Sequence, residues 1–560
     1  MTIFELLKDG GRALLDALFP RRQALATLRA KWGQPGDKAH GGISRCFDLT
    51  RDASAGDVVD DQTWTDLEFP RLFADLDTTE SPLGSQYLYR QLRRYVEPAQ
   101  AAAHYASCQT LRADAPLRER LQLALAGLDT ASNWQLARFI FGAPPEVGPL
   151  HRLLPWWSLV CVAVVVLVIA TPLPVWALLL TVGVNLMLIL SLSAPLFRDI
   201  ELLKGCSQLL RVADGLARIR SGASALPQLD RLRAEAPLRR KARGSLGWIA
   251  WLYSPWIQSV AIWLNLLCLL ELAAYGRTVT RFVRVRTELA ATFESVGAVD
   301  AAIAVASFLE QRPQHCEPVI AKGSLLDLVD ATHPLTKRPV ANSIRLDGRS
   351  ALITGSNMAG KTTCIKLVGI NLILGRTLGF CFAREATLPH TRVMAVIRGE
   401  HSVESGKSHY FAEMTAIQTF IERADRGTCR LFLIDELFNG TNTVERLAAG
   451  RAVLERLGRN AQVLVTTHDV ELQDDVTGPY DLYYFQEDPD VDGWFDYRLR
   501  AGRTDRRNAI QLLARNGFPA DLVADALAYA HTYALSAHPR PTPGPAILDT
   551  TAGADGRSIP

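Results

Sequence analysis

The chain has 560 residues, of which 48% are hydrophobic and 21% are charged. This composition excludes a disordered or fibrous protein and gives enough length for several domains and at least one large core. The formal net charge of +3 is too small to indicate nucleic-acid binding by itself.

Nine cysteines are scattered along the chain, and no two of them form a CxxC pair. A zinc site or a disulfide framework is therefore not expected, and free thiols in a reducing, cytoplasmic setting fit better. The first residues, Met1–Leu15, carry acids early and lack the apolar stretch of a secretory signal.

The first part of the chain is expected to be helical. Residues 1–58 form an N-terminal segment of mixed composition, and residues 59–312 are predicted to form an all-α core. From Asp60 to Ser132 the apolar residues recur at helical spacing. The positions expected to be buried there are Leu88, Leu92, Leu111, Leu117, Leu121 and Leu125.

Within this core, residues 153–197 contain no charged residue and no histidine. One membrane-spanning helix needs about 20 apolar residues, so this stretch is long enough for two. Thr171–Pro174 interrupts it with two prolines, which favour a turn. We therefore predict a transmembrane helical hairpin; a helical pair buried in a soluble core is the alternative.

The flanks of the hairpin indicate its orientation. Trp156, Trp157 and Trp176 lie near the expected membrane interfaces, where aromatic residues are enriched. Arg152 precedes the first span and Arg198 follows the second, whereas the turn is uncharged. Because cytoplasmic flanks carry the positive charge, both long flanks are expected in the cytoplasm.

A second uncharged, tryptophan-rich stretch covers residues 244–270 and contains Pro255. It is interpreted as a re-entrant or in-plane segment, or as part of the helical core, since a single crossing would separate the two flanks. The basic cluster at residues 231–243 precedes it. This cluster favours contact with anionic lipid headgroups, with a solvated helix face and a DNA-backbone contact as alternatives.

Residues 198–226 and 277–310 are again expected to be helical, and the pattern of apolar residues changes after them. Residues 313–535 alternate short β-type runs with helical stretches, which predicts an α/β domain with a largely parallel sheet. The predicted strands are Ser350–Thr354, Arg430–Ile434 and Gln462–Thr466. Residues 536–560 are rich in Pro, Gly, Thr and Asp and are expected to be a disordered tail.

The first of these strands is followed by a phosphate-binding pattern, GxxxxGK[ST], from Gly355 to Thr362. Glycines let the backbone fold around phosphates, and the loop amides and the following helix N-terminus supply positive potential. Lys361 is expected to reach the β- and γ-phosphates, and Thr362 to ligate Mg²⁺. The predicted nucleotide-binding residues are Gly355, Ser356, Asn357, Met358, Ala359, Gly360, Lys361, Thr362 and Thr363.

Two further strands supply candidate catalytic groups. An apolar strand ends in Asp435, a candidate Mg²⁺ ligand, and Glu436 follows it as the candidate residue that activates the attacking water. His468 ends another strand and is predicted to sense the γ-phosphate. Each of these side chains could instead serve only a structural role at a strand end.

The sequence motifs around these residues resemble those of the MutS family. Thr354–Lys361 is similar to its P-loop, with Asn-Met between the glycines, and Asp435–Asn442 is similar to its acidic pair and following turn. Ser408–Met414 resembles its signature loop, whose serine completes the ATP site of the neighbouring subunit. The resemblance implies an α/β P-loop NTPase domain of the ABC type, C-terminal to a helical core, with ATP and Mg²⁺ as cofactors, a homodimer and contact with the DNA backbone.

The chain also departs from the family pattern. No Phe-x-Glu mismatch wedge is present in residues 1–58, and the apolar hairpin lies where the DNA-clamping arms would extend. We therefore expect a membrane-associated MutS-like ATPase, at a bacterial inner membrane with its ATPase domain in the cytoplasm and membrane lipids among its partners. An ABC-type transporter-associated ATPase and a membrane scaffold switched by ATP are the alternatives.

Overall fold

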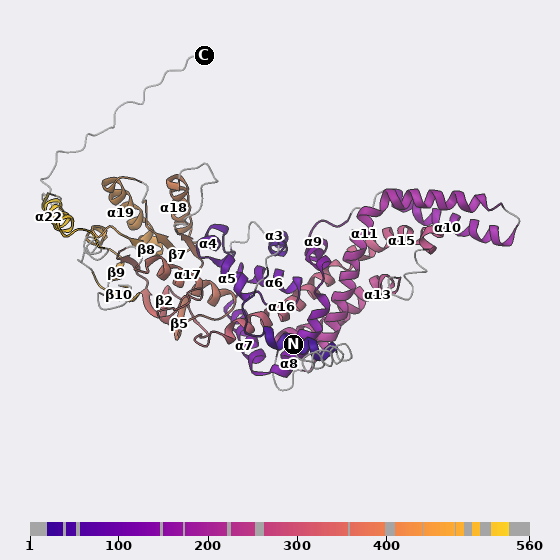
Figure 1. The fold of residues 1–560 in the computed structure, drawn as a ribbon, viewed down its shortest axis with the longest axis horizontal. Helices are drawn as coiled ribbons and strands as arrows, with labels where there is room; N and C mark the ends of the chain where they lie inside the picture. The colour runs from indigo at the N-terminus through magenta and orange to yellow at the C-terminus, as the bar shows by residue number, and fades with distance from the viewer. Residues whose placement is uncertain are drawn as a thin grey trace, which may run out of the picture.

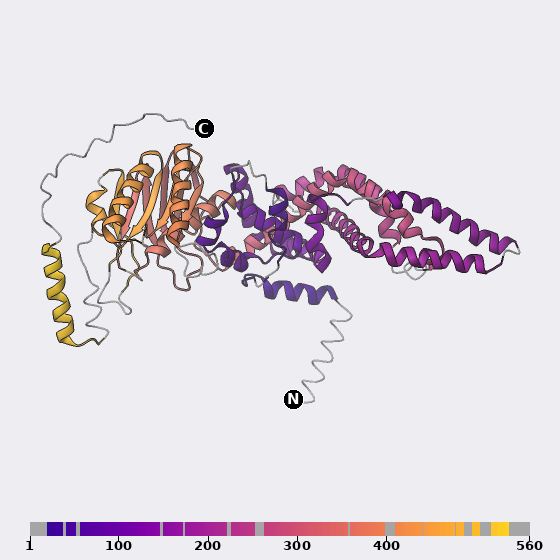
Figure 2. The same cartoon turned by 90° about the horizontal axis from the view of Figure 1, so that it is seen from above.

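The computed structural model describes residues 20–36, 38, 41–51, 57–145, 149–171, 174–220, 226–252, 263–356, 359–397, 409–438, 441–476, 478–486, 495–503 and 517–536. The molecule is elongated: the α/β domain lies at one end, the helical core lies in the middle, and a helical pair projects from the other end (Figures 1 and 2). The predicted tail and the residues Asn357, Met358 and Ser408 lie outside the described part, apart from Ser536.

The helical core is built around α16 (Arg286–Glu310), whose small residues let other helices approach closely. Asp300 of α16 accepts backbone hydrogen bonds from Glu80 at 2.8 Å and Ser81 at 2.9 Å, at the start of α6 (Pro82–Leu92). All six leucines predicted to be buried are at most 1% exposed, which confirms the helical periodicity. Other helices that pack on α16 are α5 (Phe69–Leu76), α7 (Pro98–Ala113), α8 (Ala115–Leu125) and α9 (Leu136–Phe141), whereas α4 (Asp61–Asp66) packs on α5 and on β6 (Val393–Val396) of the α/β domain.

The N-terminal segment contributes two helices to this core, α2 (Pro20–Lys31) and α3 (Arg45–Thr50). The Arg118 guanidinium stacks on the Trp32 ring at 3.6 Å from its centroid, just after α2. The mixed composition of residues 1–58 does not predict this packing, because the contacts join residues far apart in the chain.

The projecting pair consists of α10 (Pro149–Ala170) and α11 (Trp176–Arg218). The second helix continues without a break from the predicted hairpin into the core, so its 43 residues extend over about 65 Å. It packs on α12 (Pro227–Ala234) and α13 (Ala236–Leu252), and α15 (Leu270–Arg284) packs on α10.

Among the described residues, two helical stretches are, by length and composition, apolar enough to cross a membrane. Leu153–Ala170 has a mean hydropathy of 2.6 and is only 17% buried, whereas α16 has a mean hydropathy of 1.5 and is 78% buried. The second is therefore the core helix of the folded chain. Most apolar side chains of the first stretch are left exposed by the described chain, although Leu154 and Cys161 are buried.

The α/β domain contains two sheets. The six-stranded sheet has the order β10-β9-β4-β8-β7-β6 and is parallel except for the edge strand β10. Its strands are β4 (Ser350–Thr354), β6 (Val393–Val396), β7 (Leu431–Asp435), β8 (Gln462–Thr467), β9 (Tyr480–Tyr484) and β10 (Arg500–Ala501). The three predicted strands correspond to β4, β7 and β8, and they are confirmed.

A four-stranded sheet of order β1-β5-β2-β3 adjoins it, formed by β1 (Val319–Ala321), β2 (Leu325–Ala331), β3 (Asn342–Asp347) and β5 (Glu385–Pro389). In the described part of the domain the helices are α17 (Lys361–Thr377), α18 (His409–Asp425), α19 (Thr443–Asn460), α20 (Leu472–Asp475) and α22 (Ala520–Ser536).

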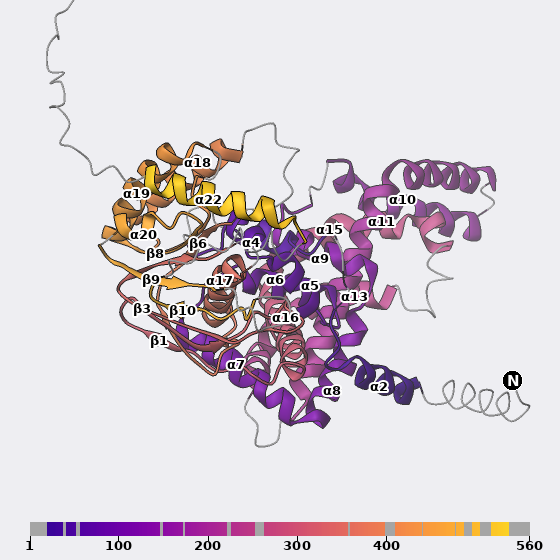
Figure 3. The same ribbon diagram turned by 60° about the vertical axis from the view of Figure 1, so that its left-hand side comes forward.

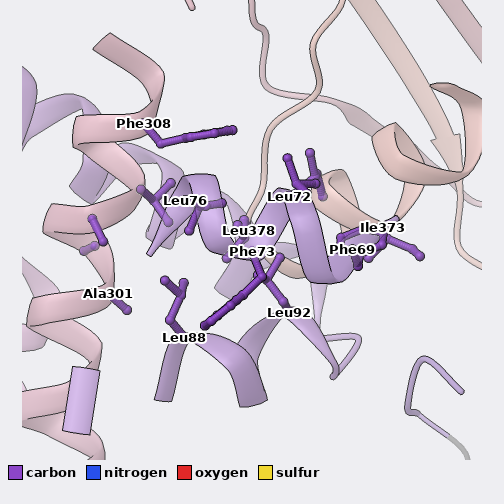
Figure 4. Packing of buried hydrophobic residues seen from close by; sticks show 14 of the residues in the cluster. Phe69, Leu72, Phe73, Leu76, Leu88, Leu92, Ala301, Phe308, Ile373 and Leu378 are labelled. Atoms are coloured by element: carbon purple, nitrogen blue, oxygen red, sulfur yellow. The ribbon is translucent and has the colours of Figure 1, made fainter. Parts of the chain in front are cut away.

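The helical core and the α/β domain share one apolar interior. Helix α17 lies between the six-stranded sheet and the core helices (Figure 3). Ile373 and Leu378, in and just after α17, join one cluster with side chains of α5, α6 and α16 (Figure 4). An ion pair between Lys366 and Glu68, with 2.6 Å between Nζ and Oε1, also links α17 to the core. Helix α17 is thereby packed directly against the helical core.

Candidate nucleotide site

The predicted site residues lie at the carboxyl edge of the six-stranded sheet. Strands β4, β8 and β7 are neighbours and run parallel, so the segments that follow them meet at the same edge. This is where open α/β sheets bind their ligands. The loop after β4 leads directly into α17, which begins at Lys361.

The glycine loop has a backbone that only glycine adopts easily. Gly355 has φ +146° and Gly360 has φ +106°, both in the region that favours glycine. A Cβ at Gly355 would lie 2.8 Å from the carbonyl oxygen of Phe485, so a side chain there would clash with backbone. The loop is therefore shaped by its glycines, as a phosphate-binding loop requires.

Lys361 is 4% exposed, and its ammonium group lies inside the loop. Its Nζ donates to the carbonyl oxygens of Gly355 at 2.8 Å and Ser356 at 3.0 Å. The same Nζ lies 3.2 Å from Nδ1 of His468. The hydroxyl of Ser356 is buried and has no hydrogen-bond partner within the described structure, so the loop offers an unused donor beside the ammonium group.

Asp435 is held by two hydroxyls from different elements. Thr362 Oγ1, at the start of α17, donates to Asp435 Oδ2 at 2.8 Å, and Thr466 Oγ1, from β8, donates to Oδ1. The described residues contain no group of three or more His, Cys, Asp or Glu side chains that could hold a metal by themselves. A hydroxyl and one carboxylate fit Mg²⁺, which usually binds through one or two protein oxygens plus phosphates and waters.

Glu436 follows β7 with φ 55°, a left-handed conformation that is strained for a non-glycine residue. Its N–H donates to the carbonyl oxygen of Thr466 at 3.1 Å, which fixes the backbone across the sheet edge. Its Oε1 contacts Nε2 of His468. Two predicted catalytic side chains, from two strand ends, are thus brought together, and the Lys361 ammonium group lies beside the same imidazole ring.

The remaining predicted residues divide into three groups. Ala359 is buried in the loop, whereas Thr363 is exposed on the first turn of α17, one residue past Thr362. Asn357 and Met358 in the loop, and Ser408 in the predicted signature loop, lie outside the described residues. Their predicted roles therefore stay predictions.

Several residues around the site were not predicted from the sequence. Thr466 holds Asp435, and the Gln473 amide donates to Thr354 Oγ1 at 2.7 Å, at the end of β4. Arg446 of α19 forms a two-point ion pair with Asp469, the residue after His468, with distances of 2.7 and 2.8 Å. A hydroxyl residue two positions before His468 was the one available signal, since it shares the end of the strand that carries the histidine.

The fold and the site together are those of an α/β domain joined to a helical region. The carboxyl edge of its mostly parallel sheet carries a glycine loop, a lysine and two acids. Residues 351–534 match the model of MutS domain V. This part of the chain is therefore similar to domain V of the MutS family, the family that its loop and strand-end sequences resemble.

Among known relatives, the endonuclease MutS2 of Clostridium novyi (strain NT) is 33% identical over 217 residues, which are 37% of this chain and 27% of that protein. The DNA mismatch repair protein MutS of Pelotomaculum thermopropionicum is 27% identical over 271 residues, 45% of this chain and 31% of that protein. The endonuclease MutS2 of Streptococcus agalactiae serotype Ia is 31% identical over 222 residues, 37% of this chain and 27% of that protein. The chain therefore matches less than a third of the length of these relatives.

Proposed function

We propose that the chain is a Mg²⁺-dependent ATPase that works as a homodimer and couples ATP hydrolysis to movement of its helical core. The observation that carries the proposal is the convergence of Lys361, Thr362, Asp435, Glu436 and His468 at one edge of the sheet. This set contains a phosphate-binding cation, a metal-binding pair and an acid for water activation, which are the parts that phosphoryl transfer needs.

The binding half of the site is formed by the glycine loop and the start of α17. Lys361 and the N-terminal amides of α17 give the loop its positive potential. Thr362 and Asp435 would hold Mg²⁺, whose charge neutralises phosphate oxygens when it is bound. The unpartnered Ser356 hydroxyl supports this fit, because it leaves a buried donor for a phosphate oxygen.

The catalytic half consists of Glu436 and His468. A carboxylate at the end of β7 can accept a proton from a water, and its rigid backbone keeps it in place while it does so. His468 contacts both the Glu436 carboxylate and the Lys361 ammonium group, so it orients the acid relative to the loop. This contact supports the predicted role of His468 as the residue that senses the γ-phosphate.

The homodimer rests on the family resemblance of the Ser408 loop, whose serine would complete the partner's ATP site. From His409 onward the predicted loop is helical and forms the first turns of α18, so the prediction of a loop over residues 409–414 is wrong. Glu413, within this segment, accepts a hydrogen bond from the N–H of Phe438 in the turn after Glu436. Closure of one site against the partner would therefore be felt at the water-activating acid of the other.

We further propose that the hairpin of α10 and α11 spans a membrane. Its exposed apolar side chains include Trp156, Leu159, Ile169, Trp176 and Leu190, which are between 60% and 81% exposed. A continuous apolar surface of this kind is costly in water and favourable in lipid. The orientation argued from Arg152 and Arg198 then leaves the ATPase domain in the cytoplasm.

The structure around Asn185 supports a re-entrant reading of the second apolar stretch. Residues 263–268 are helical, and the chain then breaks at Leu269, which has φ 54°. The Asn185 amide of α11 donates to the carbonyl oxygens of Leu266 at 2.9 Å and Leu267 at 3.1 Å. Ser158 of α10 donates to the carbonyl oxygen of Cys268 at 2.5 Å.

Such bonds matter most at membrane depth. Backbone carbonyls freed by a helix break have no water to bond there, and protein groups must satisfy them. The described end of residues 244–270 therefore packs on the hairpin, and polar side chains of α10 and α11 satisfy its broken backbone. This arrangement favours a re-entrant segment over a part of the helical core.

What the ATPase drives is inferred from α11 and from the relatives. Because α11 runs from the hairpin tip into the core, a core movement would tilt or shift the hairpin as one rigid element. The similarity to a DNA mismatch repair protein and to an endonuclease supports DNA as a partner, contacted through its backbone. A second candidate, a membrane scaffold switched by ATP, is favoured by the same continuity of α11.

The test is ATP turnover by the detergent-purified full chain, with and without Mg²⁺ and with homoduplex, mismatched and branched DNA at low salt. Turnover that requires Mg²⁺ and is lost in Lys361→Ala supports the ATPase. Stimulation by one DNA structure, weakening with salt, supports the DNA partner. No binding to any of these DNAs would remove DNA and leave the scaffold.

A further inference from the structure

A hollow of about 850 Å³ lies between the first half of α10 and the length of α15. One wall is apolar and comes from Pro155, Trp156 and Leu159, at the start of the apolar stretch of the hairpin. The other wall comes from α15 and includes Arg277, Arg281 and Arg284. None of these residues belongs to the nucleotide site.

The three arginines form a cationic stripe. They stand at positions i, i+4 and i+7 of α15, which places them on one face of the helix. All three are exposed, and none of them forms an ion pair within the described part of the chain. Uncompensated arginines on one face of a helix attract an anion, and their planar groups bind phosphate oxygens in pairs.

The acids whose side chains the structure describes near α15, Asp199 and Glu288, are bonded elsewhere. Asp199 of α11 accepts a hydrogen bond from Tyr275 at 2.6 Å and does not line the hollow. Glu288, in the first turn of the next helix, is paired with Lys241 at 2.5 Å. The hollow is therefore positive along one wall and apolar along the other.

The apolar wall faces outward as well. Trp156 is 70% exposed and Leu159 is 60% exposed, although both line the hollow. Tryptophan with arginine at the end of an apolar helix is typical of the level at which lipid headgroups lie. A ligand that fits both walls carries a phosphate next to hydrocarbon.

We propose that this hollow binds the headgroup of an anionic phospholipid of the cytoplasmic leaflet. The phosphate lies against Arg277, Arg281 and Arg284, and the first part of the acyl chains lies along Trp156 and Leu159. The proposal rests on the membrane position proposed for the hairpin. A free phosphate ion would use the stripe alone and would gain nothing from the apolar wall.

The consequence is a lipid contact on an element of the core. Only Val285 separates α15 from α16, the central helix of the core. A lipid held by α15 would therefore anchor the membrane end of α15 and α16, and α16 leads to the ATPase domain. Helix α11 would provide a second connection between the membrane and the helical core.

The test is native mass spectrometry of the detergent-solubilised full chain after incubation with phosphatidylglycerol or with phosphatidylcholine. We expect the wild type to retain phosphatidylglycerol in preference to phosphatidylcholine. The combined change Arg277→Gln, Arg281→Gln and Arg284→Gln should lower this retention by at least about tenfold, since each basic residue contributes to binding an anionic headgroup. Arg→Lys changes at the same positions should retain part of the binding, which controls for misfolding.

A charge-matched control comes from the α/β domain, where Arg338, Arg426 and Arg459 are exposed. Changing these three to Gln removes the same charge far from the hairpin and should leave lipid retention unchanged. Equal retention of the two lipids by the wild type would overturn the proposal, as would unchanged retention in the α15 variant. Displacement of the lipid by millimolar inorganic phosphate would also overturn it, because it would show a simple anion site.

Extraction of cell membranes with alkaline carbonate separates the two proposals. The wild type and the α15 variant should both stay in the membrane pellet, because the hairpin is unchanged. A wild type that stays in the pellet without lipid preference would contradict the headgroup site only. A wild type released into the supernatant would contradict the membrane position, and the headgroup site with it.

Discussion

Glu413 of α18 accepts a hydrogen bond from the backbone N–H of Phe438, two residues after the candidate water-activating acid Glu436. Phe438 has φ 55°, like Glu436, so the turn between them is unusual at both ends. Helix α18, which begins directly after Ser408, is thereby bonded to the turn that sets the direction of Glu436. In the proposed homodimer, Ser408 would complete the ATP site of the partner. The bond from Phe438 to Glu413 would then connect that ATP site to Glu436 in the chain's own ATP site.

The first prediction concerns this contact. Glu413→Ala removes the carboxylate that accepts the Phe438 N–H and helps to fix this turn, so we expect ATP turnover to fall about tenfold with ATP binding little changed. Glu413→Gln keeps an oxygen acceptor and should retain most of the activity. Glu422→Ala, an exposed change on the same helix, is the matched control. Equal turnover in the Ala variant and the wild type would rule out a positioning role.

The second prediction concerns Thr466. Thr466→Val keeps the shape of the side chain and removes the hydroxyl that donates to Asp435, so the carboxylate loses part of its orientation. We expect the Mg²⁺ concentration for half-maximal turnover to rise about tenfold, within the range for outer-shell ligands. Thr466→Ser should behave like the wild type. An unchanged Mg²⁺ requirement in the Val variant would show that Thr362 alone positions Asp435.

The third prediction concerns Asn185 in the hairpin. Asn185→Leu leaves the Leu266 and Leu267 carbonyls without donors, and we expect a loss of about 1–2 kcal/mol in the free energy of unfolding in detergent. Met187→Leu, an exposed change two residues along the same helix, should have little effect. Thermal unfolding of both variants measures the difference. Equal stability would indicate that the chain break at Leu269 is satisfied in another way.

The fourth prediction is a pH effect. Burial lowers the pKa of His104 to about 4 from the ordinary value of 6.5. The folded state therefore favours neutral His104, and its contribution to stability is complete above about pH 6.5 and is lost as the pH falls towards 4. This contribution is at most about 3 kcal/mol. The unfolding free energies of the wild type and His104→Gln should therefore converge as the pH falls across this window. Parallel curves would show that His104 titrates normally.

The sequence predicted the strands and the residues at their ends because both depend on short patterns. An apolar run followed by Asp435-Glu436 specifies a buried strand with acids at its exit, and the glycine loop specifies its own turn. The roles of the side chains stay predictions from the same patterns. The buried leucines of the core followed from helical spacing in the same local way.

The features that the sequence did not predict depend on contacts between distant segments. Thr466 belongs to the site because β8 pairs with β7, and Glu413 contacts Phe438 because α18 packs beside the turn. Neither contact can be read from a short stretch of sequence. The single length of α11 could not be foreseen either, because its apolar and amphipathic halves differ in composition. The sequence of α2 contains no motif or apolar spacing that predicts its packing on the core.

The central claim is that Glu436 activates water in a MgATP site formed by this edge of the sheet. The most direct measurement is ATP turnover and bound ATP in Glu436→Gln, made together on the same preparation. The account predicts that the variant binds ATP as the wild type does, loses at least about a hundredfold in turnover and accumulates as an ATP-bound dimer. Wild-type turnover in Glu436→Gln would contradict it, and so would a loss of ATP binding.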